Sequence, residues 1–245
     1  MHADQGNARV TIPLDRMEAP EILACVEPFT AARPAEVASL AAASVRVRKP
    51  PPAVLVAEGQ VADGLYVVLR GRVHLVRAGE GGRDLILATL GPGDVFGENC
   101  ACGGAPMSTT AVVAVQSELL RVPAETLGEH LRREPETMLR LMRLQHEKLR
   151  EVEAIASGLA LCDVEQRLRR TLARLARRQG RRNPSSSGWI LAPVPTQSEL
   201  ARMVGSCRET VSRTLSAMAR SGLVSASGRR MIVDDSLIMG VGDVG

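Results

Sequence analysis

Aromatic residues are scarce in this sequence: 245 residues include two Phe, one Tyr and one Trp, or 2% of the chain. Proteins that bind single-stranded nucleic acid stack bases on aromatic side chains, so this scarcity argues against that class. Apolar runs are also short, and none approaches the roughly 20 residues of a membrane-spanning helix. The sequence does not open with the charged start and apolar core of a signal peptide, so we expect a cytoplasmic protein without a membrane partner.

Motifs for catalysis and metal binding are missing as well. We find no Ser-His-Asp set, phosphate loop or metal-ligand spacing, so the sequence predicts neither an enzyme nor a metal site. The cysteines are odd in number and form no C-x-x-C pair, which favours reduced thiols. The cysteines are Cys25, Cys100, Cys102, Cys162 and Cys207, and the scattered histidines are His2, His74, His130 and His146.

The charge is unevenly distributed along the chain. The formal net charge is +4, but residues 163–233 contain fourteen Lys or Arg and four Asp or Glu, a net of +10, which leaves −6 for the remainder. A basic C-terminal module on an acidic remainder is typical of DNA binding.

The strongest local pattern lies between Pro195 and Gly222. Thr196 and Glu199 have the spacing of a capping box that begins a first helix, and Gly205 follows it where a sharp turn needs a positive φ. Val211, Leu215 and Met218 share the buried face of a second helix. Its polar face is suited to base edges in a major groove and carries Arg208, Glu209, Ser212 and Arg213.

Two other interpretations of this pattern stay open on spacing alone. The pair could be an ordinary helical hairpin with a solvated charged face. Ser206 and Glu209 are also spaced as a second capping box. The residues that follow favour DNA binding, because 223–226 and 231–233 have the pattern of two strands around a Ser227-Gly228 turn, with Arg229 and Arg230 placed for phosphates. A helix pair followed by a basic hairpin is a winged helix-turn-helix.

The stretch VGSCRETVSRTL resembles the recognition helix of the cyclic-AMP receptor protein and fumarate–nitrate regulator (CRP/FNR) family. The cyclic-AMP branch has Arg-Glu-Thr-Val-x-Arg there, which this chain matches from Arg208 to Arg213, while Ser212 is the residue type of the fumarate–nitrate branch. The resemblance extends from about Phe29 onward. It implies a homodimeric transcription regulator that binds double-stranded DNA at an inverted repeat of TGTGA-like half-sites, with RNA polymerase as a further partner. It assigns base reading to Arg208, Glu209, Ser212 and Arg213, and phosphate contacts to Thr196, Gln197, Thr210, Arg229 and Arg230.

Short strands separated by glycine turns occupy residues 53–123. They resemble the double-stranded β-roll of cyclic-nucleotide-binding domains through Gly59, Gly71, Gly91-x-Gly93-Asp94 and Phe96-Gly97-Glu98; a generic jelly roll is the alternative. We therefore expect an α+β chain. Its predicted parts are a poorly ordered N-terminal arm followed by a short helix (1–27), a β-roll sensor domain (28–134), a dimerisation helix (135–162), a winged helix-turn-helix domain (163–235) and a loose tail (236–245).

A heptad seam runs along the predicted helix 136–161, with Gln145 at one position. Packing on its own β-roll is the alternative use of such a face, and a seam over several turns favours self-pairing. Asp163, with Gln166 three residues later, begins the next helix and marks a hinge. The pattern of residues 180–188 predicts an exposed loop. Its family counterpart contacts RNA polymerase in some activators, and a plain flexible connection is the alternative. The predicted dimer interface comprises Met138, Met142, Leu149, Val152, Ala156 and Leu159.

The resemblance also implies a ligand pocket, and this chain departs from it. In the cyclic-AMP branch a Gly-Glu pair and an Arg-Ser pair hold the nucleotide; Gly97, Glu98 and Ser108 match, but Met107 replaces the arginine. Val152 and Glu153 stand where that branch has threonine and serine facing the adenine. Loss of a charged contact costs about 1.5–3 kcal/mol. We therefore expect no cofactor and no control by cyclic AMP, and leave open another nucleotide or small ligand.

The same residues bear on three other kinds of sensor. Cys25 is alone in the region where the fumarate–nitrate branch carries its iron–sulfur cysteines, so such a cluster is not predicted. His74 has the residue type of a haem ligand but lies in an apolar strand, where an ordinary histidine fits. Cys100 and Cys102 are the remaining alternative, as a thiol redox sensor.

Overall fold

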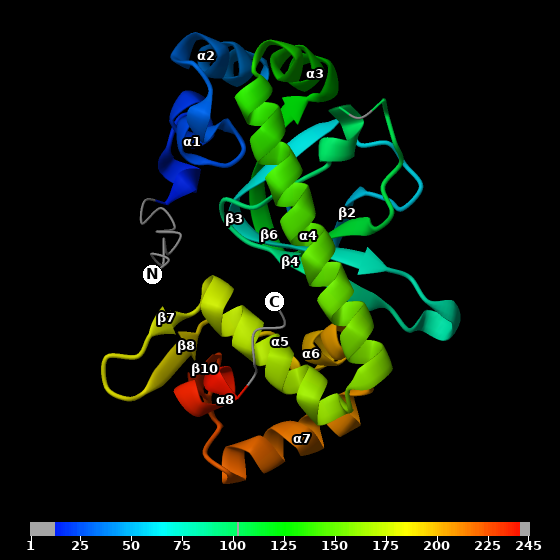
Figure 1. The fold of residues 1–245 in the computed structure, drawn as a ribbon, viewed down its shortest axis with the longest axis vertical. Coiled ribbons are helices and arrows are strands. Elements are labelled where there is room, and N and C mark those ends of the chain that lie inside the picture. Colours follow the sequence, from blue (N-terminus) through cyan, green and yellow to red (C-terminus); the bar gives the residue numbers. More distant parts are fainter. Residues whose placement is uncertain (1–12, 102, 241–245) are drawn as a thin grey trace. The chain divides into compact units, whose positions relative to one another are not determined.

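The computed structural model describes residues 13–101 and 103–240 (Figure 1). The chain divides into two compact units. The first comprises Met1–Arg77 and Ala88–Lys148, and the second comprises Ala78–Leu87 and Leu149–Gly245. Among the described residues, no helix combines the length and the apolar character needed to span a bilayer.

The first unit is built on a β-roll. Strands β1, β6, β3 and β4 follow one another in the sheet, with β2 added to β6 and β5 added to β3. Long antiparallel pairing between β3 and β6 forms its spine, from Gly64 opposite Pro123 to Val76 opposite Thr110. The strands are β1 Val45–Lys49, β2 Ala53–Val56, β3 Gly64–Arg77, β4 Leu85–Leu90, β5 Val95–Phe96 and β6 Thr110–Pro123. The predicted β-roll is confirmed, and β1 and β5 are additions that the sequence pattern did not indicate.

Helices cover one side of this roll and share a core with it. Leu14, Ile22 and Leu23 are buried together with Leu65 and Val67 of β3. The segment expected to be an arm thus packs into the domain from Leu14 onward. The helices are η1 Leu14–Arg16, α1 Ala19–Cys25, η2 Phe29–Ala31, α2 Pro34–Ala43 and α3 Ala124–Arg133, with short η3 Glu80–Gly82 and η4 Glu98–Ala101 in the connections.

A second core fills the inside of the roll. Tyr66 and Phe96 stack with their ring centroids 5.0 Å apart. Val56, Val73, Leu90 and Met107 are buried with them. Figure 1 shows the strands that enclose this core.

Helix α4, Pro135–Leu161, has two different faces. Thr137, Leu141 and Gly158 on one face are buried. The face predicted as the dimer seam is exposed, with Met142 61%, Leu149 54% and Val152 41% accessible. Half-buried residues at 144, 148, 151 and 155 continue the buried face, so both faces recur at alternating intervals of three and four residues.

The second unit holds the helix-turn-helix and a four-stranded sheet in the order β7-β8-β10-β9. Its elements are α5 Val164–Gln179, β7 Arg181–Arg182, β8 Gly188–Leu191, α6 Gln197–Val204, α7 Arg208–Arg220, β9 Val224–Ser227, β10 Arg230–Asp234 and α8 Asp235–Met239. The region expected to be a loop at 180–188 therefore contributes β7 and the start of β8.

The prediction of a loose tail is wrong for residues 236–239, which belong to a helix that begins at Asp235. This helix is α8, with Leu237 and Ile238 buried. Asp234 caps this helix, because its side chain accepts a hydrogen bond from the Ser236 amide at 2.9 Å. Residues 241–245 lie outside the described part of the chain.

Candidate nucleic-acid interface

Helix α6, the first helix of the helix-turn-helix, begins at the predicted capping box. The Thr196 hydroxyl accepts from the Glu199 amide at 3.2 Å, and the Glu199 carboxylate accepts from the Thr196 amide at 2.7 Å. Both bonds satisfy amides at the start of α6 that have no partner within the helix. Leu200, Ala201, Met203 and Val204 are buried, which fixes the orientation of the helix.

The turn between α6 and α7 depends on Gly205. Its φ is +62° and its ψ is +49°, in the left-handed region that favours glycine. A Cβ at this position would lie 2.8 Å from Cδ2 of Leu159. Both constraints exclude most side chains and set the angle at which α7 leaves the turn.

Helix α7 presents its predicted reading face in its first two turns. Arg208, Glu209 and Arg213 are exposed and Ser212 is half-buried, while Val211 and Met218 are buried on the opposite face. Leu215, expected beside them, is half-buried. Within the described residues Arg208 makes no hydrogen bond or ion pair, and Arg213 makes one bond, to the Thr210 hydroxyl at 3.4 Å. The two guanidinium groups are therefore available to a partner molecule.

Glu209 remains a carboxylate at neutral pH. Hydrogen bonds from its own backbone amide and from Cys207 lower its pKa, and the charges of Arg208 and Arg213 act in the same direction. The N-cap of α7 is Cys207, so the alternative capping box between Ser206 and Glu209 does not begin this helix. The carboxylate is exposed, so a donor outside the protein can also reach it.

The residues predicted to contact phosphate come from adjoining segments. Gln197 is exposed at the start of α6, and Arg229 and Arg230 are exposed at the β9–β10 turn. The Val194 amide donates to the Arg229 carbonyl at 3.0 Å, which ties the turn to the segment entering α6. Thr210 is engaged through its hydroxyl with the Cys207 thiol at 3.1 Å.

The junction between α4 and α5 is capped as the sequence predicts. Asp163 is the N-cap of α5 and forms a capping box with Gln166. A contact that sequence reasoning missed joins this junction to α6: Arg167 donates to the Cys162 carbonyl at 2.7 Å and to the Val204 carbonyl at 2.8 Å. One guanidinium thus links the predicted hinge to the end of the first reading helix.

The predicted ligand pocket is only partly assembled in the first unit. Gly97 has a φ of +85°, and a Cβ there would lie 2.5 Å from the Gly64 carbonyl oxygen, so glycine is required by the fold itself. Met107 is 8% exposed and belongs to the inner core. Ser108 is exposed, and its carbonyl accepts from Arg77 at 2.8 Å. Val152 and Glu153 are exposed residues of the second unit.

Glu98 is engaged by α4. Its Oε1 accepts from Nζ of Lys148 and from Nε2 of Gln145, both at 2.6 Å. Lys148 also donates to the Val95 carbonyl at 3.1 Å. Oε2 of Glu98 is buried and has no hydrogen-bond partner among the described residues. The glutamate that matches the nucleotide-holding Gly-Glu pair of the cyclic-AMP branch is therefore bonded here to a protein ammonium and a protein amide.

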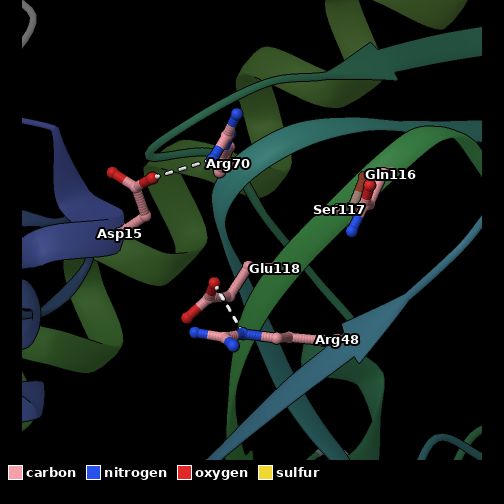
Figure 2. Close-up of a pocket in the computed structure, with 6 residues that line it drawn as sticks. All are labelled: Asp15, Arg48, Arg70, Gln116, Ser117 and Glu118. Carbon is pink, nitrogen blue, oxygen red and sulfur yellow. Dashed lines mark hydrogen bonds and ion pairs between the residues drawn. The ribbon is translucent and has the colours of Figure 1, made fainter.

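A second hollow on the β-roll is lined by charged side chains that pair with one another (Figure 2). Asp15 lies 3.7 Å from Arg70, and Glu118 lies 3.0 Å from Arg48 and 2.9 Å from Arg46. Burial raises the pKa of Glu118, but the bonds from the two arginines outweigh it, so the pKa is lowered. The mutual pairing leaves these charges largely satisfied without a ligand.

The thiol pair proposed as a redox sensor lies partly outside the described residues, because Cys102 is not among them. Cys100 is half-buried against both hydrophobic cores. Cys25, also half-buried, donates to the Ile22 carbonyl at 3.3 Å, and burial raises its pKa. His74 is buried in β3 with its Nδ1 3.2 Å from the Thr89 hydroxyl, as an ordinary strand histidine would be.

Comparison with known families and structures matches both units. The family described as cyclic nucleotide-binding domain matches residues 46–134, and the Crp-like helix-turn-helix domain matches residues 166–236. The cyclic AMP receptor protein of Thermus thermophilus is 34% identical over 169 residues, which are 68% of this chain and 73% of that protein. The CRP-like cAMP-activated global transcriptional regulator of Mycobacterium tuberculosis is 29% identical over 218 residues, 88% of this chain and 96% of that one.

Solved structures show the same fold. The c-di-GMP responsive global regulator CLP of Xanthomonas campestris aligns with a TM-score of 0.66 at 26% identity, over 82% of this chain and 99% of that chain. FixK2 from Bradyrhizobium japonicum aligns with a TM-score of 0.73 at 21% identity, over 82% and 98%. The second likeness concerns the fold alone.

Proposed function

Because this chain belongs to the CRP/FNR superfamily of DNA-binding transcription regulators, we propose that it binds an inverted repeat of TGTGA-like half-sites as a homodimer, without control by cyclic AMP. The observation that carries the proposal is the exposed first half of α7, where Arg208 has no partner within the described chain. A guanidinium held free at the start of a recognition helix is suited to the O6 and N7 acceptors of guanine.

The other residues of α7 complete the reading of a half-site. Glu209 accepts from the N4 amine of a cytosine, which is the partner of a guanine on the other strand. Arg213 contacts a second guanine from the next turn of the helix, and Ser212 faces the base between. Arg229 and Arg230 contact phosphates and hold the module on the duplex without choosing bases.

Two copies are required because an inverted repeat has two-fold symmetry. The exposed seam of α4 supports self-pairing, since large apolar side chains at a four-three spacing gain most by burial against a second helix. The recognition helices then enter successive major grooves about 34 Å apart, one helical turn of DNA. RNA polymerase is the proposed further partner, with the β7–β8 hairpin as the surface it meets.

Met107 and Glu98 support the proposed independence from cyclic AMP. Relatives in Mycobacterium tuberculosis and Thermus thermophilus are named for cyclic AMP. In this chain the buried thioether of Met107 stands where the family resemblance places the phosphate-binding arginine, and a thioether offers no charge to a phosphate. Glu98 is already bonded to Lys148 and Gln145.

Selection of bound sequences from random duplex DNA tests the proposal. The purified full-length protein should recover an inverted repeat of two similar half-sites, and the Arg208→Ala variant should recover sites with one guanine position relaxed in each half. Recovery of sites without an inverted repeat, or of repeats indifferent to Arg208→Ala, would overturn the assignment.

A further inference from the structure

A groove of about 340 Å³ lies within the second unit, beside the helix-turn-helix. The last turns of α4 form one wall, α5 forms the other, and the end of α6 closes it. Its apolar lining comes from Ala154, Ile155, Gly158, Leu159, Ala173, Met203 and Val204. The size and mainly apolar lining are those of a small-molecule site.

Gly158 keeps the groove open at its α4 wall. A Cβ built on Gly158 would meet only the side chain of Arg167, at 3.8 Å and 3.9 Å. Its backbone is that of an ordinary helix, so glycine is not needed for the conformation. The effect of the missing side chain is therefore space inside the groove.

The rim of the groove is strongly basic. Five arginines line it, and Glu151 is the one acidic residue among the lining side chains. Arg178 donates a hydrogen bond to the Glu151 carboxylate at 2.5 Å, and Arg167 donates its hydrogen bonds to backbone carbonyls. Arg170 and Arg174 make no hydrogen bond or ion pair among the described residues. The five are Arg167, Arg170, Arg174, Arg177 and Arg178.

Arg174 is the group that most needs a partner. Burial lowers its pKa and outweighs the opposing charge of Glu151, while the charge of Arg178 lowers the pKa further. Arg174 is half-buried, and the carboxylate that acts on it, Glu151, is already bonded to Arg178. A partly buried guanidinium in this position is unfavourable, and an anion beside it relieves that penalty. The adjacent apolar lining gives the same ligand an apolar body.

We propose that this groove binds a small amphipathic anion, whose carboxylate or phosphate pairs with Arg174 while its apolar body lies against Ile155 and Met203. The site is separate from the dimer seam, because Ala154, Ile155 and Gly158 lie off the Leu149–Val152–Ala156 stripe of α4; Leu159 belongs to both. It is also separate from the β-roll pocket in the first unit.

Occupancy of the groove should change DNA binding. Arg167 links the α4–α5 junction to the Val204 carbonyl, and Val204 itself lines the groove at the end of α6. A ligand in contact with α4, α5 and α6 changes the packing that positions α6 and α7, the two helices of the helix-turn-helix. This consequence rests on the proposed function, whereas binding of the anion does not.

Calorimetric titration of the full-length protein with decanoate and with decyl phosphate tests the site. At least one of the two anions should bind with a stoichiometry of one molecule per chain. Arg174→Met, which keeps the aliphatic volume, should weaken this binding at least tenfold. Inorganic phosphate and decyltrimethylammonium should bind at least tenfold more weakly. Decanoate and decyl phosphate distinguish a carboxylate from a phosphate preference.

Two further variants separate a ligand site from a structural role. Gly158→Leu should fill the groove and abolish binding, while Arg169→Ala should bind as the wild type does, because Arg169 pairs with Glu165 at 2.6 Å and does not line the groove. Arg174→Met should melt at or above the wild-type temperature, since it removes a half-buried charge that makes no hydrogen bond or ion pair among the described residues. Absence of anion binding, equal binding of the cation, or binding unaffected by both groove variants would refute the site.

A second titration, of labelled operator DNA with and without decanoate, tests the coupling. Operator affinity should change in the wild type and stay constant in Arg174→Met. If the anion binds and operator affinity is unchanged, the coupling is refuted and the site stands. If no operator is bound under any condition, the proposed function fails, and calorimetry still decides the site.

Discussion

Replacing Arg208 by alanine removes a side chain that the folded protein does not use. Arg208 is exposed at the start of α7 and makes no hydrogen bond or ion pair in the described part of the chain. The free energy of unfolding should therefore change by no more than about 0.5 kcal/mol. Any loss of DNA binding then reports a contact with DNA and not a loss of folded protein.

The size of the loss follows from the chemistry of the contact. A bidentate pair between arginine and guanine contributes about 1–3 kcal/mol of discrimination against other bases. That corresponds to about 5- to 150-fold for each half-site. A dimer on a symmetric operator carries the change twice, so the total loss should reach about 2–6 kcal/mol if the two distant sites add.

Fluorescence anisotropy with labelled duplexes measures this directly. The wild type and Arg208→Ala are each titrated with the selected operator and with three duplexes in which the guanine proposed to contact Arg208 is replaced by each of the other bases. The wild type should prefer guanine, and the variant should bind all four alike. Arg229→Ala is the matched control, because loss of a phosphate contact weakens every duplex equally and lowers the salt slope by about 1 for each half-site, or about 2 for the dimer. An Arg208→Ala variant that keeps its preference for guanine would refute the base contact.

Three further predictions concern the seam, the turn and the buried histidine. Leu149→Glu with Val152→Glu should give monomers in sedimentation, whereas Arg150→Glu, which lies off the seam, should leave the dimer intact; a dimeric double variant would contradict the seam. Gly205→Ala should lower the free energy of unfolding by about 1–2 kcal/mol, because an L-residue is strained at a φ of +62°; Gly158→Ala, where no clash arises, should not lower it. Burial holds the pKa of His130 below 6.5 despite Glu36 and Glu134, so its stabilising contribution is present above pH 6.5 and is lost as the pH falls through the lowered pKa. The melting temperature of the wild type should thus fall more steeply below pH 6.5 than that of His130→Gln, while His146→Gln should follow the wild type.

Features set by residues a few positions apart could be predicted from sequence. Thr196 with Glu199 and Asp163 with Gln166 form capping boxes as expected, because each needs only a spacing of three on a helix. Gly205 takes the positive φ that the turn requires. The polar face of α7 follows from the helical period.

Features set by distant partners could not be predicted. The sequence around Leu14 and Ile22 gives no sign of burial, because the surface that buries them belongs to β3, which is distant in the chain. Leu237 and Ile238 likewise form a helix only because α8 packs on α5 and β10. Gln145 was assigned to the dimer seam, and its amide is instead bonded to Glu98, a residue 47 positions away. The basic groove beside α5 appears in sequence as a run of arginines, and only packing shows which of them lack a partner.

Titration of the selected operator with the full-length protein, in the absence and presence of saturating cyclic AMP, tests the central claim most directly. We expect two chains per inverted repeat, one binding curve with and without the nucleotide, and loss of binding when one half-site is scrambled. A large gain in operator affinity on adding cyclic AMP, or binding of a single chain to a single half-site with full affinity, would contradict the account.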